Sequence, residues 1–520
     1  MLKDTPLDSL NEEQRMAVTC TEGPVLINAG AGSGKTRVLT SRIALLMSRG
    51  VPPGRILALT FTKKAANEMK RRIYAATGFS TRELCMGTFH SVFIRFLRDY
   101  ADRLGYPREF TIYDEDDFES ALRQCVLEVL YGTDWKEARR AMGEERLAEA
   151  KRIEARYRTK SVRSRISLAK NNLISASDYA LDPAIAEEDR RAGRELMPRI
   201  FLLYQRRLKT AGVMDFDDIL INTDWLLKNV PEALQDLGHR FDYILVDEYQ
   251  DTNYAQYLIL RKLAQFHRNL SVVGDDSQSI YSFRGARIEN ILRFQKDYGE
   301  AKVFRLEQNY RSTQTIVNAA NSLISKNENR LKKECFSKGG IGEKIHVIKA
   351  FTDQEEAYLT ASAIIERIYA DKAQYSDFAI LYRTNAQSRT FEESLRRKNL
   401  PYRIYGGHSF YEREEIKDMI AYFKLVVNPH DDEAFRRIIN KPARGIGDTS
   451  IEHLTAAARE AECTLLEAIA LPDERLQAAG LREAAVKKFR EFAAMIGPLA
   501  RKTATTDAFS LALEVGNVSG

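Results

Sequence analysis

Two short segments of the chain combine residue types that could bind a nucleotide and cleave a phosphate from it. The segment NAGAGSGKT, residues 28–36, is rich in glycine and ends in lysine and threonine. Small residues let backbone N–H groups approach an anion, a lysine can reach the terminal phosphates, and a hydroxyl can bind Mg²⁺. We therefore predict that Lys35 contacts phosphate and that Thr36 binds Mg²⁺, although Ala29 stands where a strict P-loop begins with glycine.

Two carboxylates in the second segment, YILVDEYQD at residues 243–251, supply the rest of this chemistry. Asp247 and Glu248 follow an apolar run, where carboxylates are costly unless they have partners or a role. We predict that Asp247 holds Mg²⁺ and that Glu248 orients and deprotonates the attacking water. A structural salt bridge is the alternative for this pair taken alone. Arg311 is a candidate cation for charge that develops on the γ-phosphate, and a surface ion pair is its alternative.

A third segment, GDDSQSIYSFRGA at residues 274–286, places carboxylates, an amide, aromatic rings and an arginine in close succession. Aromatic faces stack on any base, and cations attract the phosphate backbone. We interpret the segment as a link between a nucleotide site and a site for single-stranded nucleic acid.

Short apolar runs precede these segments and are typical of buried parallel strands. They are PVLINAG (24–30), RILALTFT (55–62), ELCMGTFH (83–90), YILVDE (243–248) and LSVVGDD (270–276). Helical patterns lie between several of them, so we predict a doubly wound α/β core. A second α/β unit is predicted from further candidate strands at 302–307, 343–350 and 376–382.

Two long stretches lack strand patterns and interrupt this alternation. The gap before 243–248 is too long for an ordinary crossover, so we predict a helical insertion at about 113–212. Its segment 151–170 carries eight Lys or Arg against one Glu, which indicates either a solvated helix face or a surface that contacts phosphates. A second helical stretch runs from about 383 to 520.

Composition narrows the class of protein. The 520 residues are too many for one core, and the formal net charge of +6 is compatible with a polyanionic partner. Five cysteines without a CxxC pair argue against a zinc site or a disulfide framework and are typical of a reducing compartment. Because no apolar run reaches membrane-spanning length and the N-terminus lacks a signal peptide, we expect a cytoplasmic protein without a membrane partner.

The motifs together resemble those of the UvrD/Rep/PcrA-like superfamily 1 DNA helicases, in the order found in that family. The matching segments are LNEEQ (10–14), AGSGKT (31–36), TFTKKAANEM (60–69), GTFHS (87–91), VDEYQDTN (246–253), VGDDSQSIYSFRGA (273–286), LEQNYRS (306–312), YRTNAQSR (382–389), 404–422 and 438–448. The resemblance implies two RecA-like motor domains with parallel sheets, a helical insertion in each, and ATP with Mg²⁺ in the cleft between them. It also implies movement 3′ to 5′ on single-stranded DNA and unwinding of duplex in repair or replication.

The resemblance divides the chain into four parts. A first RecA-like domain takes 1–112 with 213–287, an insertion takes 113–212, a partial second RecA-like domain takes 288–382, and a second insertion takes 383–520. The family's later motifs, one containing histidine and glycine and one with a second arginine finger, are not found in the sequence. We therefore expect the N-terminal portion of a helicase with an incomplete second motor domain. A truncated, catalytically weak ATP- and DNA-binding module is the alternative, and a small-molecule P-loop kinase is disfavoured.

Site residues follow from the same resemblance. Gln14 is expected to read the adenine edge, Tyr310 to stack on the base, and Gln278 to sense the γ-phosphate. The expected nucleotide-binding set is Gln14, Ala31, Gly32, Ser33, Gly34, Lys35, Thr36, Arg37 and Tyr310. The expected catalytic set is Lys35, Asp247, Glu248, Gln278 and Arg311.

Nucleic-acid contacts are implied in the same way, with single-stranded DNA and its junctions with duplex as partners. The residues expected to contact single strands are Phe61, His90, Tyr281, Phe283, Arg284, Arg383 and Asn385. Relatives often have tryptophan at the position of Phe283, and stacking should survive with less area. Gly445 and Gly447 resemble a hairpin that meets duplex backbone, with an ordinary turn as the alternative. Repair or replication proteins are possible partners, and the oligomeric state is not predicted.

Overall fold

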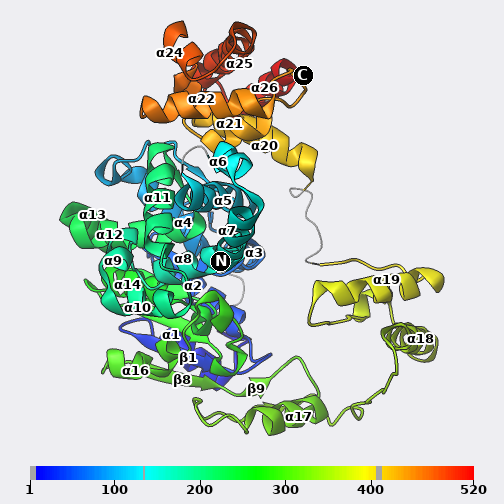
Figure 1. Cartoon of the computed structure of the whole chain (residues 1–520). Coiled ribbons are helices and arrows are strands. Elements are labelled where there is room, and N and C mark those ends of the chain that lie inside the picture. The colour runs from blue at the N-terminus through cyan, green and yellow to red at the C-terminus, as the bar shows by residue number, and fades with distance from the viewer. Residues whose placement is uncertain (1–6, 133–134, 406–412) are drawn as a thin grey trace. The chain divides into compact units, whose positions relative to one another are not determined.

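The computed structural model describes residues 7–132, 135–405 and 413–520 (Figure 1). The chain separates into two compact units. One comprises Met1–Gly342 with Ala421–Gly520, and the other comprises Glu343–Ile420. Among the described residues, no helix combines the length and apolar character needed to cross a membrane.

Six parallel strands form the central sheet of the first unit, in the order β3-β2-β6-β7-β1-β8. The strands are β1 (Val25–Ala29), β2 (Ile56–Thr60), β3 (Cys85–Thr88), β6 (Tyr243–Val246), β7 (Leu270–Gly274) and β8 (Lys302–Leu306). Every residue of β1, β2 and β7 is buried, as expected for strands covered on both faces of a sheet. The predicted α/β core with a parallel sheet is confirmed.

Helices cover both faces of this sheet because alternate strand residues point to opposite sides. Leu26 of β1 packs in one core with helices α4 (Phe89–Asp99), α12 (Phe216–Asn229), α13 (Pro231–Arg240) and α14 (Tyr254–Leu263). Its neighbours Val25 and Ile27 pack in a second core with α1 (Glu12–Thr19), α2 (Lys35–Ser48) and α3 (Lys63–Thr77). Because all six strands are parallel, their carboxyl ends lie at the same edge of the sheet, and ligands of such sheets bind at that edge.

Three of the predicted strands differ from the structure. Residues 302–307 were expected in a second α/β unit, but β8 pairs with β1 from Val25↔Lys302 to Ala29↔Leu306 and extends the first sheet. The segments 343–350 and 376–382 do not form strands, and Val347 and Leu381 are 89% and 93% exposed. A strand is stabilised by a hydrogen-bonded neighbour, and the described part of the second unit contains no strand to pair with them.

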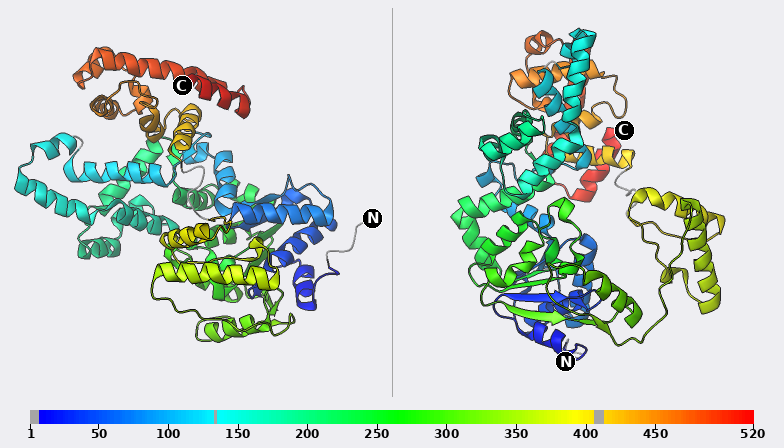
Figure 2. Two further views of the ribbon diagram at one scale, coloured as in Figure 1. Left: turned by 90° about the vertical axis from the view of Figure 1, so that its right-hand side faces the viewer. Right: turned by 60° about the horizontal axis from the view of Figure 1, so that its bottom comes forward.

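The stretch between β4 (Thr111–Ile112) and β5 (Val213–Met214) is helical, as its sequence predicts. Because β4 and β5 pair with each other, the helical stretch begins and ends at neighbouring points of the first unit. The helices, cyan to green in Figure 2, enclose a core of their own. They are α5 (Glu115–Tyr131), α6 (Trp135–Ala141), α7 (Glu144–Arg156), α8 (Thr159–Asn171), α9 (Ala176–Leu181), α10 (Pro183–Arg191) and α11 (Met197–Thr210).

A buried ion cluster joins this helical stretch to α12. The Lys170 ammonium, near the end of α8, donates to the Asp215 carboxylate at 2.6 Å and to Asp218 at 2.8 Å. All three side chains are at most 2% exposed. Burial and the charge of Asp215 raise the pKa of Asp218 to about 6. One lysine of the basic segment 151–170, Lys170, therefore neutralises buried carboxylates, in addition to the exposed face of the segment.

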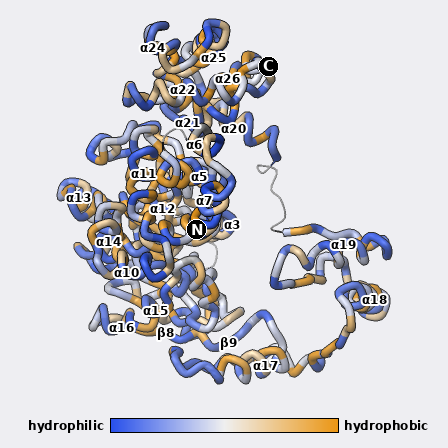
Figure 3. The backbone as a smooth tube through the Cα atoms, viewed as in Figure 1, coloured by the Kyte–Doolittle hydropathy of each residue, from blue (hydrophilic) through white to orange (hydrophobic). Residues whose placement is uncertain are grey.

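The remaining elements lie on either side of β8 in the sequence and in the second unit and the C-terminal stretch. In the first unit, the short helices α15 (Glu289–Leu292) and α16 (Phe294–Asp297) precede β8, and β9 (Gln308–Asn309), α17 (Gln314–Ile324) and β10 (Phe336–Ser337) follow it. The second unit contains α18 (Asp353–Asp371) and α19 (Ser388–Arg397). The C-terminal stretch is helical, with polar and apolar residues interspersed along its helices (Figure 3). Its elements are α20 (Glu414–Val427), α21 (Asp432–Ile438), α22 (Asp448–Glu460), α23 (Leu465–Ala468), α24 (Asp473–Ala478), α25 (Glu483–Lys502) and α26 (Ala508–Ser519).

Candidate functional site

The loop between β1 and α2 has the shape of a phosphate-binding loop. Gly32 and Gly34 have φ values of +68° and +88°, a region that L side chains rarely adopt. Ser33 is buried and donates to the Gly30 carbonyl oxygen at 2.7 Å, which closes the turn. Helix α2 begins at Lys35, so its unpaired N–H groups face the loop. Lys35 and Thr36 are thus the first two residues of α2, next to the loop, and their contacts with phosphate and metal stay predictions.

The two predicted catalytic carboxylates follow β6 and face this loop. Lys35 Nζ lies 3.2 Å from Glu248 Oε2, so the lysine and the candidate base form an ion pair. Glu248 has a φ of +50°, which is uncommon for a residue with a side chain and indicates local strain. Burial and the charge of Glu248 raise the pKa of Asp247 to about 7. Bound Mg²⁺ would favour the ionised carboxylate, because a nearby cation stabilises negative charge.

The donor set fits a magnesium ion that is shared with phosphates. Among the described residues, no group of three or more His, Cys, Asp or Glu side chains could hold a metal. Mg²⁺ typically binds through one or two carboxylates together with substrate phosphates and water, and does not require an all-protein cage. Asp247, with the Thr36 hydroxyl at the start of α2, matches that pattern.

The residues predicted to bind the base lie beside the same loop. Gln14, on α1, is buried and donates to the Ser33 carbonyl oxygen at 2.8 Å. The Tyr310 hydroxyl accepts a hydrogen bond from Asn11 Nδ2 at 2.9 Å, and the tyrosine is 52% exposed. Gln14 thus supports the loop while Tyr310 leaves much of its ring available. Arg37 is the third residue of α2 and is exposed.

The segment that carries Arg311 packs directly on the phosphate-binding loop. Asn309 Nδ2 donates to the Ala31 carbonyl oxygen at 2.7 Å, and the Tyr310 N–H donates to the Gly32 carbonyl oxygen at 2.9 Å. A Cβ atom added at Gly32 would lie 2.9 Å from Arg311 Cβ. The structure therefore brings Arg311 to the loop, and its contact with the γ-phosphate stays a prediction. Asn309 was not singled out from the sequence, where nothing distinguishes it from its neighbours.

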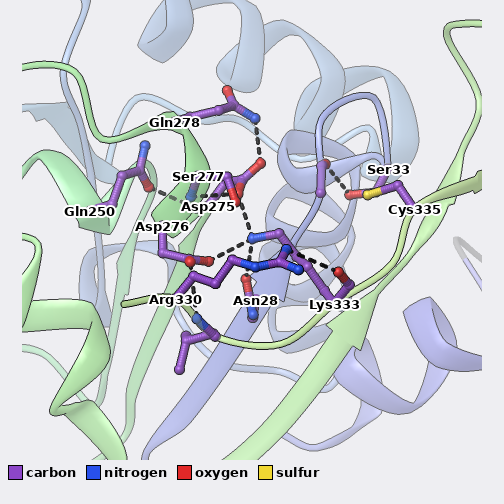
Figure 4. Close-up of polar contacts among 12 residues, drawn as sticks. Asn28, Ser33, Gln250, Asp275, Asp276, Ser277, Gln278, Arg330, Lys333 and Cys335 are labelled. Atoms are coloured by element: carbon purple, nitrogen blue, oxygen red, sulfur yellow. Dashed lines mark hydrogen bonds and ion pairs between the residues drawn. The ribbon is translucent and has the colours of Figure 1, made fainter. Parts of the chain in front are cut away.

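A second residue missed from the sequence, Gln250, joins the carboxylate segment to the third segment. Its amide nitrogen donates to Glu248 Oε2 at 2.9 Å, and its amide oxygen accepts from the Asp275 N–H at 2.9 Å. Asp275 Oδ2 in turn accepts from the Gln278 amide nitrogen at 2.6 Å (Figure 4). A continuous path of polar contacts thus runs from Lys35 to Gln278. The sequence signals for Gln250 were its place two residues after Glu248 and within the matching segment VDEYQDTN.

The aromatic residues of the third segment follow immediately. Tyr281 and Phe283 are 38% and 71% exposed, and their ring centroids lie 6.0 Å apart. The side chain of Arg284 lies outside the described part of the structure. Gly285, with a φ of +84°, ends the short helical turn that presents the rings. Two exposed rings three and five residues after Gln278 are suited to stacking on bases.

The other predicted single-strand contacts in the first unit lie just beyond β2 and β3. Phe61 packs against Phe89, with ring centroids 5.5 Å apart. His90 is half-buried and meets Phe216 at 5.6 Å. Burial lowers the pKa of His90 to about 4, against the opposing effect of a hydrogen bond to the backbone of Phe216. A neutral imidazole can donate or accept hydrogen bonds to DNA but adds no charge attraction near neutral pH.

The remaining predicted contacts, Arg383, Asn385, Gly445 and Gly447, lie in later parts of the chain. Arg383 and Asn385 belong to the second unit, where the Arg383 N–H donates to Gln387 Oε1 at 3.0 Å. Gly445 has a φ of +65°, and its carbonyl oxygen accepts from Lys488 Nζ at 2.8 Å. Gly447 directly precedes α22. The roles predicted for these four residues stay predictions.

Comparison with known proteins places the chain in a family. The UvrD/REP helicase N-terminal domain matches residues 10–299, and the UvrD-like helicase C-terminal domain matches residues 304–474. The second match corrects the expectation that the family's C-terminal motifs are absent, because residues 304–474 carry the pattern of that domain.

Similar proteins named ATP-dependent DNA helicase PcrA occur in several bacteria. The protein of Leuconostoc citreum is 40% identical over 505 residues, which is 97% of this chain and 63% of the relative. The protein of Staphylococcus aureus strain Mu50 is 42% identical over 468 residues, 90% of this chain and 60% of the relative. The chain thus spans about 60% of the length of these relatives. Together with the geometry of the phosphate-binding loop, these matches show that the chain belongs to the UvrD/REP helicase family.

Proposed function

We propose that the chain acts as an ATP-dependent DNA helicase that moves 3′ to 5′ on single-stranded DNA and unwinds duplex at junctions, in repair or replication in the cytoplasm. The observation that carries this proposal is the polar path from Lys35 to Gln278. It supports the proposal because it ends three residues before Tyr281. A change in the contacts of the nucleotide can therefore alter the position of Tyr281 and Phe283 through a few hydrogen bonds.

The chemistry follows from residues already close together. Lys35 pairs with Glu248 in this structure, and γ-phosphate oxygens would compete for the lysine and release Glu248 to act on water. Thr36 and Asp247 would hold Mg²⁺, which supplies charge neutralisation at the phosphate oxygens. Arg311 would stabilise negative charge that develops on the γ-phosphate in the transition state.

Coupling to DNA would use the third segment. When Glu248 exchanges partners, Gln250 loses or gains a hydrogen bond, and Gln250 also holds the backbone of Asp275. A shift of Asp275 moves Gln278 and, through the following turn, the rings of Tyr281 and Phe283. Stacking accepts any base, so a cycle of grip and release on a strand does not depend on sequence.

A module that binds ATP and DNA without turnover is the second candidate. The observation that favours it is the Lys35–Glu248 ion pair, because both groups are unavailable for catalysis while they neutralise each other. The two candidates share the same binding residues and differ in whether ATP is hydrolysed and strands are separated.

Strand displacement decides between them. Duplexes that carry a 3′ tail, a 5′ tail or no tail are mixed with the chain and ATP, and release of the labelled strand is followed by fluorescence. Lys35→Ala serves as the control that removes the phosphate contact. We expect displacement from the 3′-tailed duplex by the wild-type chain only. Retained binding of ATP and DNA without displacement supports the module, and equal displacement from the 5′ tail contradicts the proposed direction.

A further inference from the structure

Lys333 is a buried lysine at the nucleotide site that no sequence motif indicated. It lies between α17 and β10, 22 residues after Arg311 in a stretch with the sequence NRLKKEC. Its ammonium donates to Asn28 Oδ1 at 2.9 Å, to Asp276 Oδ1 at 2.6 Å and to Asp275 Oδ1 (Figure 4). The lysine side chain is 4% exposed.

These contacts use the full capacity of the ammonium group. A lysine has three N–H donors and no acceptor, and three oxygens surround it. The Asp275 and Asp276 side chains are 2% and 0% exposed, so water contributes little to their charges. Two carboxylates this deeply buried require a cation, and Lys333 supplies it.

The three partners come from the elements that form the nucleotide site. Asn28 is in β1, directly before the phosphate-binding loop, and Asp275 and Asp276 follow β7. Backbone contacts dock the segment of Lys333 at the same place, since the Leu331 N–H donates to Asp276 Oδ2 at 3.0 Å. A Cβ atom added at Gly30 would meet Cys335 Sγ at 2.3 Å, so this segment also lies against the loop.

The contact fixes the orientation of the carboxylate that holds Gln278. Asp275 Oδ1 accepts from Lys333 and from the Ser277 N–H, at 3.1 Å in the second case. The other oxygen, Oδ2, is thereby left to accept from the Gln278 amide nitrogen at 2.6 Å. Without the ammonium, the carboxylate could rotate, and that change alters the contact with Gln278.

We propose that Lys333 is a positioning residue of the nucleotide site, whose ammonium holds the Asp275 carboxylate so that Gln278 faces the γ-phosphate. This inference rests on the proposed function, because it assumes that Gln278 responds to bound ATP. Lys333 acts through Asp275 and does not itself touch the reacting atoms.

The test compares Lys333→Met with Lys332→Met, which changes an exposed lysine next to it. ATP hydrolysis is measured as kcat and KM with saturating single-stranded DNA, and affinity for a non-hydrolysable ATP analogue is measured by fluorescence. We expect Lys333→Met to lower kcat at least tenfold while the analogue affinity changes less than threefold. Lys332→Met should match the wild type. In Gln278→Ala, adding Lys333→Met should lower kcat little further, because both changes act on one contact.

A second variant separates positioning from a general loss of stability. Lys333→Met leaves two buried carboxylates uncompensated, whereas Lys333→Met with Asp276→Asn removes one of them and keeps Asp275. The double variant should recover most of the thermal midpoint without recovering kcat. Recovery of kcat together with the midpoint overturns the inference, and so does a wild-type kcat in Lys333→Met.

Failure of the proposed function gives a different result. If the wild-type chain does not hydrolyse ATP, the proposed function fails, and the positioning role is decided by amide hydrogen exchange in residues 275–283. Exchange there should become faster in Lys333→Met and stay unchanged in Lys332→Met. Unchanged exchange in both variants overturns the inference.

Discussion

The aromatic pair Tyr281 and Phe283 provides the sharpest prediction about DNA binding. Stacking of a base on an aromatic side chain contributes about 1–3 kcal/mol, which corresponds to roughly 5- to 150-fold in affinity. Phe283 is 71% exposed and Tyr281 is 38% exposed, so more of the phenylalanine ring is available to a base. We expect Phe283→Ala to weaken binding more than Tyr281→Ala.

The two changes should not add fully. The ring centroids lie 6.0 Å apart, so each ring borders the other and one truncation alters the surroundings of its neighbour. The double variant is therefore expected to lose more than either single variant and less than the sum of the two. Both rings are on the surface, and the thermal midpoint should stay close to that of the wild type.

Fluorescence anisotropy of labelled single-stranded DNA measures these losses at fixed salt concentration, since salt alone changes the affinity. Phe509→Ala is the matched control, because Phe509 is 74% exposed and lies on α26, away from the third segment in the chain. Oligonucleotides of different base composition should give similar losses. If the double variant binds within twofold of the wild type, the third segment is not a stacking surface and the reasoning is refuted.

Three further predictions concern the framework of the site. Lys170→Met should lower the free energy of unfolding by about 3–5 kcal/mol in chemical denaturation, because it strands two buried carboxylates, whereas the exposed Lys160→Met should change it by less than about 0.5 kcal/mol. Because burial lowers the pKa of His90 to about 4, the unfolded chain binds a proton below about pH 6.5 that the folded chain does not, so the free energy of unfolding decreases as the pH is lowered. His90→Asn should remove up to about 2 kcal/mol of this decrease between pH 7 and pH 5. An unchanged pH profile of the free energy of unfolding would contradict this. Gly32→Ala should weaken ATP binding at least tenfold in a fluorescence titration, because its φ of +68° strains a side chain and its Cβ would press on the Arg311 segment; wild-type affinity would exclude this packing.

The central sheet and the phosphate-binding loop could be predicted because their signals are local. Runs of Val, Ile and Leu mark strands buried on both faces, and glycines mark the one place where backbone must approach an anion. Asp247 and Glu248 could be found because they end such a run. These features depend on residues within a few positions of each other.

The position of β8 in the sheet could not be predicted, because it depends on residues far apart in the sequence. A strand pattern indicates burial and length but does not state which neighbour the strand pairs with. Residues 302–306 therefore read as the start of a second sheet, whereas they complete the first one beside β1. The segments 343–350 and 376–382 also have a strand pattern, but they do not form strands, because the described part of the second unit offers no neighbouring strand for hydrogen bonding.

Lys333 illustrates what a single sequence conceals. In NRLKKEC it resembles its exposed neighbour Lys332, and two adjacent lysines usually indicate a solvated surface. Its burial depends on Asn28, Asp275 and Asp276, which lie 305, 58 and 57 residues away along the chain. Only tertiary structure brings these groups together.

Coupling between nucleotide and DNA is tested most directly by ATP hydrolysis with and without single-stranded DNA, for the wild-type chain and for Glu248→Gln. The substitution keeps the shape of the side chain and removes the carboxylate that would activate water. The account predicts that DNA raises the rate of the wild-type chain and that Glu248→Gln, while still binding ATP, shows no such rise. Hydrolysis that ignores DNA, or that survives in Glu248→Gln, would contradict it.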